Sequence, residues 1–303
     1  MKKLTPLSII IINFNTGALL SNCLKAILEH TLEVEYQVII IDNASTDDSL
    51  FVIPENNNIT IVKNKTNKGF GKACNQGVNH SNSEYVLFLN PDAEVRNNTI
   101  KASLKFMMNN PSMNVMGCKQ VDENGNILRT CSRFITLSNY INKLSGLSKI
   151  LPNTFPNYHM HEWNHSFSKE VDHVMGSYYL MRRKDFLKIG LFDESYFVYL
   201  EDIDLSYRVK QNKGKVYFNA EIEIYHETGG SSKNVKAKRL FYSLDSLLIY
   251  GKKHFSATHY YLLFFLVLFI EPLLRLIFNV VQLDFEGSKQ TIVGYNMLYK
   301  KNL

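Results

Sequence analysis

Residues 7–16 read LSIIIINFNT and begin the pattern from which the fold class of this chain follows. The first six of them form a continuous apolar run rich in isoleucine, which is typical of a strand buried on both faces of a mostly parallel sheet. The run is too short for a signal peptide and lacks a small-residue cleavage site. It is followed by the mostly polar segment Asn13-Phe14-Asn15-Thr16. Ligands of α/β proteins bind at such carboxyl ends of strands.

Strand and helix patterns alternate through roughly the first hundred residues. Apolar runs at residues 38–41 and 85–89 predict two further buried strands, while residues 19–28 and 71–78 carry helical patterns. The alternation predicts an α/β fold with a mixed, mostly parallel sheet flanked by helices, and a nucleotide-binding half of the doubly wound type.

Length and composition bound the organisation of the chain. Its 303 residues, 45% of them hydrophobic, suffice for one large α/β domain over residues 1–232 and a helical segment over residues 233–303. Residues 129–170 lose all periodicity, which predicts a long irregular insertion of the kind that binds ligands. The net charge of +6 is modest, and no basic-aromatic stripe indicates nucleic-acid binding. Four scattered cysteines without a CxxC pair favour reduced thiols in a cytosolic protein without zinc.

The second strand ends in DNASTDDS, residues 42–49. Asp42 is placed to accept from a pyrimidine N3–H or from a ribose hydroxyl, and the alternative is an Asx turn that leads into a cap. Residues 67–72 read NKGFGK and predict a glycine turn before a helix, where free N–H groups and lysines can approach a diphosphate. This turn is neither a GxGxxG fingerprint nor a P-loop, so it is a weak signal alone.

The third strand ends in Asn90-Pro91-Asp92. Asp92 beside a diphosphate suits Mg²⁺ or Mn²⁺, because a hard cation needs only one or two protein oxygens when phosphates and water supply the rest. The alternative is a plain Asn-Pro-Asp turn. Farther along, His226 follows a strand-like run and precedes Gly-Gly-Ser-Ser, a sequence able to close around a phosphate. A purely structural histidine is the alternative there.

Residues 199–208 read YLEDIDLSYR and place three carboxylates within four positions, directly after a stretch rich in aromatic residues. Carboxylates crowded beside aromatic rings repel one another and lose solvent, so one of them can have a raised pKa and act as a general base near neutral pH. The alternative is a helix N-terminus capped by Asp202, with Asp204 paired to Arg208 at i,i+4.

The chain resembles the family 2 glycosyltransferases of GT-A fold, and within them the bacterial rhamnosyltransferase-like enzymes that build surface polysaccharides. The resemblance covers about residues 5–232. It rests on the order and spacing of IIIINFNT, VIIIDNASTDDS, NKGFGKACNQG, FLNPDAEV, VMGSYYLMRRKDFLKIGLFDESYFVYLEDIDLSYR and HETGGSS.

The resemblance implies roles for the polar residues at the strand ends. The residues that would hold the nucleotide are Phe14, Asn15, Asp42, Asn67 and Gly69.

The resemblance also implies a metal site and a base. Asn90 stands in for the first acid of the family's DxD motif, Asp92 would hold the Mg²⁺ or Mn²⁺ ion, and His226 would meet the metal or the diphosphate. Asp202 would be the base, with Glu201 next in line.

The implied reaction is transfer of a sugar from a nucleoside diphosphate to a hydroxyl of a growing, lipid-linked saccharide. One displacement inverts the anomeric carbon, so a single base suffices and no carboxylate nucleophile is needed. The first choice of donor is dTDP-rhamnose, with UDP-galactose, UDP-glucose or UDP-N-acetylglucosamine as alternatives. A non-catalytic nucleotide-binding scaffold is the alternative from another class. A site that had lost its activity would have no reason to keep Asp42, Asp92, Asp202 and His226.

The C-terminal segment predicts contact with the inner face of the cell membrane. Residues 260–270 are apolar all round but span only about 16 Å before Glu271-Pro272 interrupts them, too little to cross a bilayer. The residues that form one polar stripe after the interruption are Glu271, Arg275, Asn279, Gln282 and Glu286. A basic collar suited to anionic headgroups comprises Lys233, Lys236, Lys238, Arg239, Lys252 and Lys253. We expect amphipathic helices that lie in the membrane surface. Core helices, a homodimer interface or a spanning hairpin are the alternatives.

Overall fold

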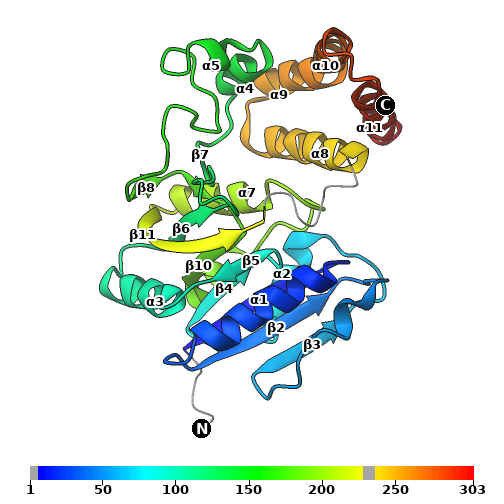
Figure 1. Cartoon of the computed structure of the whole chain (residues 1–303). Coiled ribbons are helices and arrows are strands. Elements are labelled where there is room, and N and C mark those ends of the chain that lie inside the picture. Colours follow the sequence, from blue (N-terminus) through cyan, green and yellow to red (C-terminus); the bar gives the residue numbers. More distant parts are fainter. Residues whose placement is uncertain (1–5, 228–235) are drawn as a thin grey trace.

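The computed structural model describes residues 6–227 and 236–303 and places one mixed sheet at the centre of the chain (Figure 1). The sheet has nine strands in the order β3-β2-β1-β4-β10-β6-β11-β5, with β8 paired to β11. Strands β1 to β4 are parallel, whereas β10 runs antiparallel between β4 and β6. The strands are β1 (Leu7–Asn13), β2 (Tyr36–Asp42), β3 (Ile59–Lys63), β4 (Tyr85–Leu89), β5 (Ala93–Val95), β6 (Val115–Val121), β8 (Lys169–Val171), β10 (Tyr178–Arg182) and β11 (Val216–His226).

Helices cover both faces of this sheet. Alternate residues of β1 enter two separate hydrophobic cores, Ile9 and Ile11 on one face and Ile10 and Ile12 on the other. The first core is closed by α1 (Gly17–His30) and α3 (Thr99–Asn109), and the second by α2 (Phe70–Asn79), α6 (Arg183–Ile189) and α7 (Glu201–Gln211). The predicted α/β fold with a mostly parallel sheet flanked by helices is confirmed.

The insertion at residues 129–170 is less irregular than predicted. It contains β7 (Cys131–Ser132), which pairs with β9 (His173–Val174), and two short helices, α4 (Leu137–Leu144) and α5 (Leu147–Ile150). A capping box starts α4, because Asn139 N donates to Thr136 Oγ1 at 3.2 Å and Asn139 Oδ1 accepts from Thr136 N at 2.9 Å. Trp163 is buried under Lys169, whose Nζ lies 3.7 Å from the ring centroid.

A layer of helices lies beyond the sheet, in the upper part of Figure 1. It consists of α4 and α5 with α8 (Lys236–His254), α9 (Ala257–Phe265), α10 (Glu271–Val281) and α11 (Phe285–Asn302). A third core joins Tyr140 of α4, Leu247 of α8 and Leu298 of α11 with Ile203 of α7 and with Tyr196, which precedes α7. The segment after residue 233 therefore shares its core with the α/β part instead of forming a detached appendage.

The predicted interruption at Glu271-Pro272 is wrong. Helix α9, a π-helical turn at Leu266–Ile270 and α10 run on as one helix, Ala257–Val281, of 25 residues. Pro272 has no N–H and leaves the carbonyl of Leu268 without its helical partner, but Tyr299 Oη donates to that carbonyl at 2.7 Å. Among the described residues, this is the one helix long and apolar enough to cross a membrane.

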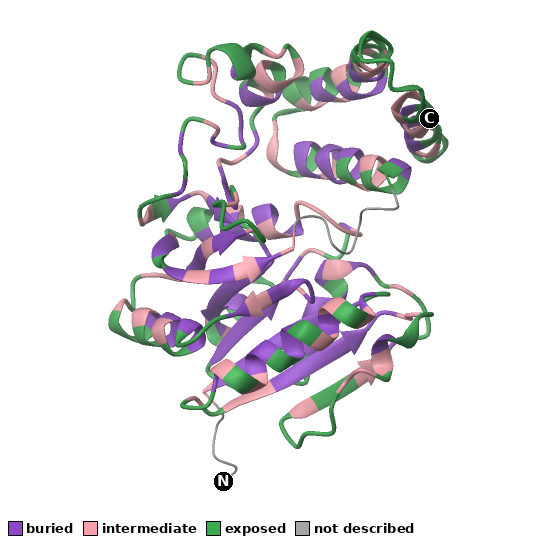
Figure 2. Cartoon of the chain, in the orientation of Figure 1, coloured by how far each residue is buried: buried purple, intermediate pink, exposed green. Residues whose placement is uncertain are grey.

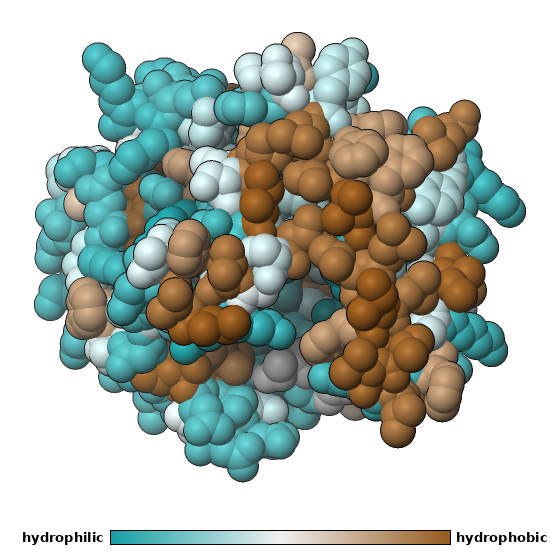
Figure 3. Space-filling model, turned by 90° about the horizontal axis from the view of Figure 1, so that it is seen from above, coloured by the Kyte–Doolittle hydropathy of each residue, from teal (hydrophilic) through white to brown (hydrophobic). Residues whose placement is uncertain are grey.

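The predicted polar stripe is divided: Glu271, Arg275 and Asn279 lie on α10 and bond to other protein groups, whereas Gln282 and Glu286 follow α10 and are exposed. Glu271 is 4% exposed and accepts hydrogen bonds from Tyr140 Oη at 2.7 Å and from Arg275 Nη2 at 2.6 Å. Asn279 Nδ2 donates to Thr291 Oγ1 of α11 at 3.3 Å. The outward face is apolar instead (Figures 2 and 3), and its exposed residues include Leu262, Phe265, Phe269, Leu273, Leu274, Ile277, Phe278, Val280 and Val281.

Only part of the predicted basic collar is free. Lys253 Nζ lies 2.7 Å from a carboxylate oxygen of Asp193 and of Asp204, so Lys253 is held by protein carboxylates. Lys236, Lys238, Arg239 and Lys252 are exposed on α8, and Lys233 lies outside the described residues.

Asp204 binds α7 to the helical layer. Its carboxylate accepts from Arg208 Nε at 2.8 Å and from His254 Nε2 at 2.7 Å, and Lys253 Nζ lies 2.7 Å away. The predicted Asp204–Arg208 pair is therefore confirmed. Burial alone would raise the pKa of Asp204, but the hydrogen bonds from His254 and Lys253 and the charge of Arg208 lower it to about 2.

We predict that Asp204→Asn lowers the free energy of unfolding at pH 7 by about 3 kcal/mol, because it leaves buried cations without their charge partner. A lowered pKa stabilises the fold above the usual value of 3.8, so the difference between wild type and variant should shrink as pH falls from about 4 to about 2. Urea unfolding along a pH series measures it. Asp193→Asn, which removes a more exposed partner of Lys253, is the control and should cost less than about 1 kcal/mol.

Candidate active site

The polar strand ends come together at one edge of the sheet. Strands β2, β1 and β4 are neighbours and parallel, so Asp42, Asn13 and the turn before Asp92 lie at the same edge. With one strand between them, the ends of β2 and β4 are separated by about 10 Å. Such a spacing allows one ligand to contact both ends through different groups.

Asp42 and Asn15 hold together the polar segments at the carboxyl ends of β1 and β2. Asp42 is buried, and its Oδ1 accepts from Asn13 Nδ2 at 2.8 Å while Oδ2 accepts from Ser45 N at 3.3 Å. Asn15 has a φ of 54°, and its Oδ1 accepts from Thr46 N at 2.7 Å. This bond joins the segment after β1 to the segment after β2. Phe14, between them, is 44% exposed, so its ring is available for stacking.

Asn43 is a residue of this site that sequence reasoning missed. It is buried, its Nδ2 donates to Asn67 Oδ1 at 2.9 Å and to the carbonyl of Gly69 at 3.1 Å, and its Oδ1 accepts from Lys68 N at 3.0 Å. Asn43 therefore holds the Asn67–Gly69 turn against the end of β2. The only signal in the sequence was its place directly after Asp42.

Gly69 joins the nucleotide side of the site to the carboxylate motif. Its φ is +84°, and a Cβ at this position would lie 2.3 Å from the carbonyl oxygen of Phe197. Phe70 N donates to the same carbonyl at 2.8 Å. Only glycine fits here, because both the conformation and the close approach exclude a side chain.

Asp92 and His226 form a pair. Strand β5 pairs antiparallel with β11, with Ala93 opposite His226, and this register places His226 Nε2 3.2 Å from Asp92 Oδ1. Both side chains are almost wholly buried. The Gly-Gly-Ser-Ser sequence predicted to close around a phosphate lies outside the described residues.

Backbone contacts connect this pair to Asp202. Asn90 N donates to the carbonyl of Ser177 at 3.1 Å, and the preceding residue, Gly176, donates its N–H to Asp202 Oδ2 at 2.8 Å. A Cβ on Gly176 would lie 3.1 Å from that oxygen, so the small residue permits the close approach. The structure thus brings Asn90, Asp92, His226 and Asp202 to one side of the site.

A strained turn presents the carboxylates. Tyr199 and Leu200 have φ values of 71° and 65°, the left-handed region that costs about 1–3 kcal/mol for such side chains. Leu200 is the N-cap of α7, so Asp202 is not the cap that the alternative reading required. Instead the Asp202 side chain is 16% exposed and its carboxylate is held by Gly176.

Glu201 points away from Asp202, into the protein. It is buried, its side chain lies against α2 with Cβ and Cγ 3.5 Å from the place of a Cβ on Gly71, and its Oε2 has no hydrogen-bond partner. Burial, and then the charge of Asp202, raises the pKa of Glu201 well above its usual value of 4.5. The buried surroundings of Glu201 therefore favour its neutral form.

The residues at the end of β4 fit a divalent cation bound together with a phosphate ligand. Among the residues that the structure describes, no three His, Cys, Asp or Glu side chains converge on one point. Asp92 offers a carboxylate oxygen and His226 an imidazole nitrogen, 3.2 Å apart. A cation held by one or two protein ligands keeps positions for phosphate and water, which is the usual arrangement for Mg²⁺ with nucleotides.

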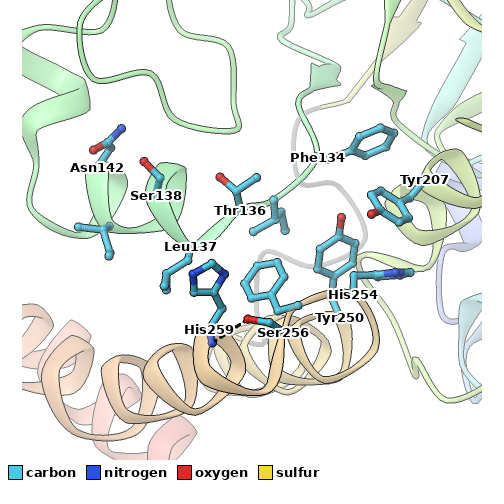
Figure 4. A pocket seen from close by; sticks show the side chains of 13 residues that line it. Phe134, Thr136, Leu137, Ser138, Asn142, Tyr207, Tyr250, His254, Ser256 and His259 are labelled. Carbon is cyan, nitrogen blue, oxygen red and sulfur yellow. Dashed lines mark hydrogen bonds between the residues drawn. The ribbon is translucent and has the colours of Figure 1, made fainter. Parts of the chain in front are cut away.

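A cavity of about 560 Å³ lies farther along α7 (Figure 4). Tyr207 of α7, Phe134 and Thr136 of the insertion, and Tyr250 and His254 of α8 are among its lining residues. Tyr207 lies about 7.5 Å along the helix axis from Asp202. None of the residues assigned above to the nucleotide, metal or base lines this cavity.

Curated relatives match most of the chain. An N-acetylglucosaminyl-diphospho-decaprenol L-rhamnosyltransferase of Mycobacterium tuberculosis is 24% identical over 254 residues, which cover 77% of this chain and 80% of the relative. The rhamnosyltransferase WbbL of Escherichia coli is 24% identical over 242 residues, which cover 80% of this chain and 81% of the relative.

Solved structures share the fold at lower identity. The mannosyltransferase PcManGT of Pyrobaculum calidifontis, in complex with GDP-Man and Mn²⁺, has a TM-score of 0.59 at 12% identity, and the match covers 100% of this chain and 89% of that one. TarS of S. aureus, residues 1–349, has a TM-score of 0.53 at 15% identity and covers 98% of this chain and 92% of that one. The chain therefore has the GT-A glycosyltransferase fold.

The family model described as "Glycosyl transferase family 2" matches residues 8–190, more than half of the chain. The match ends before Asp202 and His226, so the placement of these two residues rests on the structure. With its fold, strand-end motifs and relatives, the chain belongs to glycosyltransferase family 2.

Proposed function

We propose that this chain is an inverting, metal-dependent glycosyltransferase that moves a sugar from a nucleoside diphosphate to a hydroxyl of a lipid-linked saccharide. One observation carries the proposal: the segment Gly176–Ser177 bonds to Asp202 through Gly176 N and to Asn90 through the Ser177 carbonyl, and Asn90 precedes Asp92 at the sheet edge that also carries Asp42. These contacts support a nucleotide site, a diphosphate site and a carboxylate base on neighbouring segments of the chain.

Asp42 and the Asn67–Gly69 turn bind the nucleoside half of the donor, and Phe14 stacks on its base. The diphosphate lies toward Asp92 and His226, which would hold Mg²⁺ or Mn²⁺. The cation would supply positive charge that stabilises the departing diphosphate.

Asp202 accepts the proton of the acceptor hydroxyl as that oxygen attacks the anomeric carbon from the face opposite the diphosphate. A new carbon–oxygen bond forms as the bond to the diphosphate breaks, so the configuration inverts. Glu201, buried and favoured in its neutral form, is not placed to share this role. The Asp92–His226 pair and the partly exposed Asp202 carboxylate also favour an enzyme over a nucleotide-binding scaffold.

The first choice of donor is dTDP-rhamnose, because two relatives that match about four fifths of the chain are named rhamnosyltransferases. UDP-galactose, UDP-glucose and UDP-N-acetylglucosamine are the alternatives. A screen of dTDP-, UDP- and GDP-sugars for release of nucleoside diphosphate, with Mn²⁺, with Mg²⁺ and with EDTA, tests the donor. We expect one nucleotide sugar to give cation-dependent release. Equal release in EDTA would remove the metal from the proposal.

Asp92 and Asp42 should differ in their dependence on the cation. We predict that Asp92→Ala weakens nucleotide binding about tenfold in Mn²⁺ and leaves it within twofold in EDTA, because its role is to bridge the metal to the diphosphate. Asp42→Ala should weaken binding in both conditions, since Asp42 serves the nucleoside. Calorimetric titration of both variants with nucleoside diphosphate decides this, and equal cation dependence in the two would contradict the division of roles.

We propose further that the outward face of α9, α10 and α11 lies in the cytosolic membrane surface, where a lipid-linked acceptor is found. Figure 3 shows hydrophobic side chains gathered over these helices. Exposed patches larger than a few hundred Å² are rare on monomeric soluble proteins. Buried Glu271 bonds α10 to Tyr140 of α4, and α10 packs on α11, which favours a helix that lies in the surface over one that spans the bilayer.

The insertion shares this membrane face. Lys149 of α5 lies over the ring of Phe278 in α10, 5.6 Å from its centroid, so α5 and α10 are in contact. Ile150 and Leu151 are 76% and 50% exposed beside this contact. The exposed lysines and arginine of α8 add attraction to anionic headgroups. A homodimer through the same face is the alternative.

A further inference from the structure

We infer that His173 is a positioning residue for Asp202, which keeps the proposed base in the orientation that the transfer requires. The inference rests on the proposed function, because it takes Asp202 to be the base. His173 lies on β9, is 4% exposed, and places Nε2 3.6 Å from Asp202 Oδ2.

A buried row of hydrogen bonds fixes the other side of the imidazole. His173 Nδ1 lies 3.1 Å from Ser206 Oγ, and Ser206 Oγ lies 3.1 Å from Tyr179 Oη. Ser206 is one turn beyond Asp202 on α7, and Tyr179 is wholly buried on β10. The row therefore begins in the core and ends at the proposed base.

The direction of donation determines which nitrogen carries the proton. Burial raises the pKa of Tyr179, so its hydroxyl keeps its proton and is able to donate to Ser206 Oγ. Ser206 then donates to His173 Nδ1, and the neutral imidazole carries its hydrogen on Nε2, toward Asp202. The reverse direction would turn a lone pair of Nε2 toward a carboxylate, which is repulsive.

This arrangement orients the carboxylate of Asp202. Its Oδ2 accepts a hydrogen bond from Gly176 N at 2.8 Å, and His173 Nε2 lies 3.6 Å from the same oxygen, outside hydrogen-bond distance but close enough for electrostatic attraction. Burial lowers the pKa of His173, although Asp202 and Asp172 oppose the shift, so the imidazole is favoured as a neutral donor. The other titratable groups close to Asp202 are Glu201 of its own helix, Cys74 of α2 and Tyr179 of β10.

His173→Phe tests the inference, because phenylalanine fills the space and removes both nitrogens. We expect kcat at pH 7 to fall about tenfold, less than the loss of the base itself, with the donor KM within twofold. The acid limb of the pH profile of kcat should move to higher pH, because the proposed base loses the imidazole dipole that faces its carboxylate. His173→Gln keeps a donor toward Asp202 and an acceptor toward Ser206, and should restore most of the rate.

His165→Phe is the matched control. His165 is also fully buried, but its nitrogens contact the backbone of Cys131 and Trp163 instead of a carboxylate. It should cost stability without moving the acid limb. If His173→Phe lowers the melting temperature as His165→Phe does and leaves the pH profile in place, His173 is a core residue and the inference is wrong. Activity of Asp202→Asn close to wild type would instead overturn the proposed function, so the two failures are distinguishable.

Discussion

Asp202→Asn should abolish sugar transfer while leaving nucleotide binding intact. The amide keeps the shape of the side chain and can still accept the hydrogen bond from Gly176 N, but it cannot take a proton from the acceptor. Loss of a general base costs on the order of 10² to 10⁴ in turnover. Transfer assays and calorimetric titration with the nucleotide sugar, run on the same preparation, separate the two effects.

Glu201→Gln is the matched control for this substitution. Glu201 is adjacent in sequence and buried, and its pKa is raised by burial, so the neutral amide imitates the form that its surroundings favour. We expect turnover within a few-fold of wild type. A large loss in Glu201→Gln together with a small loss in Asp202→Asn would exchange the roles of the two carboxylates.

The second large effect concerns the membrane. Leu273→Glu combined with Ile277→Glu should lower the partition of the protein onto anionic vesicles by roughly 10² to 10⁴, because burial of each aliphatic side chain contributes about 1.5–3 kcal/mol. Both residues are about three-fifths exposed, at 59% and 61%, so their replacement leaves the folded core unchanged. Vesicle flotation at low and high salt measures the partition, and high salt should remove only the electrostatic part.

Leu32→Glu combined with Phe51→Glu provides the control, since these side chains are 83% and 88% exposed on loops beside α1 and β3, away from the helical layer. Flotation of this pair should match wild type. Surface substitutions replace truncation of the C-terminal helices, because Leu298 and Tyr295 share a core with Tyr196 and a truncated chain would expose it. If the wild-type protein dimerises in lipid-free buffer and does not float with vesicles, the apolar face is a homodimer interface and the membrane proposal is wrong.

The α/β half of the chain was predictable because its signals are local. Continuous apolar runs gave β1, β2 and β4 to within two residues at either end, since strands buried on both faces permit little else. Asp42 and Asp92 were recognisable as candidate site residues because they follow those apolar runs closely in the sequence. Parallel strands place their carboxyl ends at one edge, so position along the chain was enough to bring them together.

What the sequence did not reveal depends on long-range contacts. Helix α4 was missed because its capping box uses Asn139 in a segment rich in serine and asparagine. The continuity through Pro272 depends on a hydroxyl from Tyr299, 27 positions away. The inward turn of Glu271 depends on Tyr140, 131 positions away. Periodicity shows that a helix has two faces, but it does not show which of them the rest of the chain covers.

The site shows the same division. Asn43 and His173 act through partners that are distant in sequence, Asn67 and Asp202, and neither lies in a pattern that indicates a function alone. Gly69 was recognisable as a turn residue, whereas its contact with Phe197 follows only from the packing of the turn against the carboxylate motif.

The central claim is that one displacement, with Asp202 as the base, carries the sugar from a nucleoside diphosphate to an acceptor hydroxyl. The configuration of the new linkage tests it most directly. NMR of the product formed by the full chain from dTDP-rhamnose and polyprenyl-diphosphate-linked N-acetylglucosamine, or from the donor that the screen selects, should show the anomeric configuration opposite to that of the donor. A product with retained configuration would require a covalent or front-face mechanism and would contradict the account.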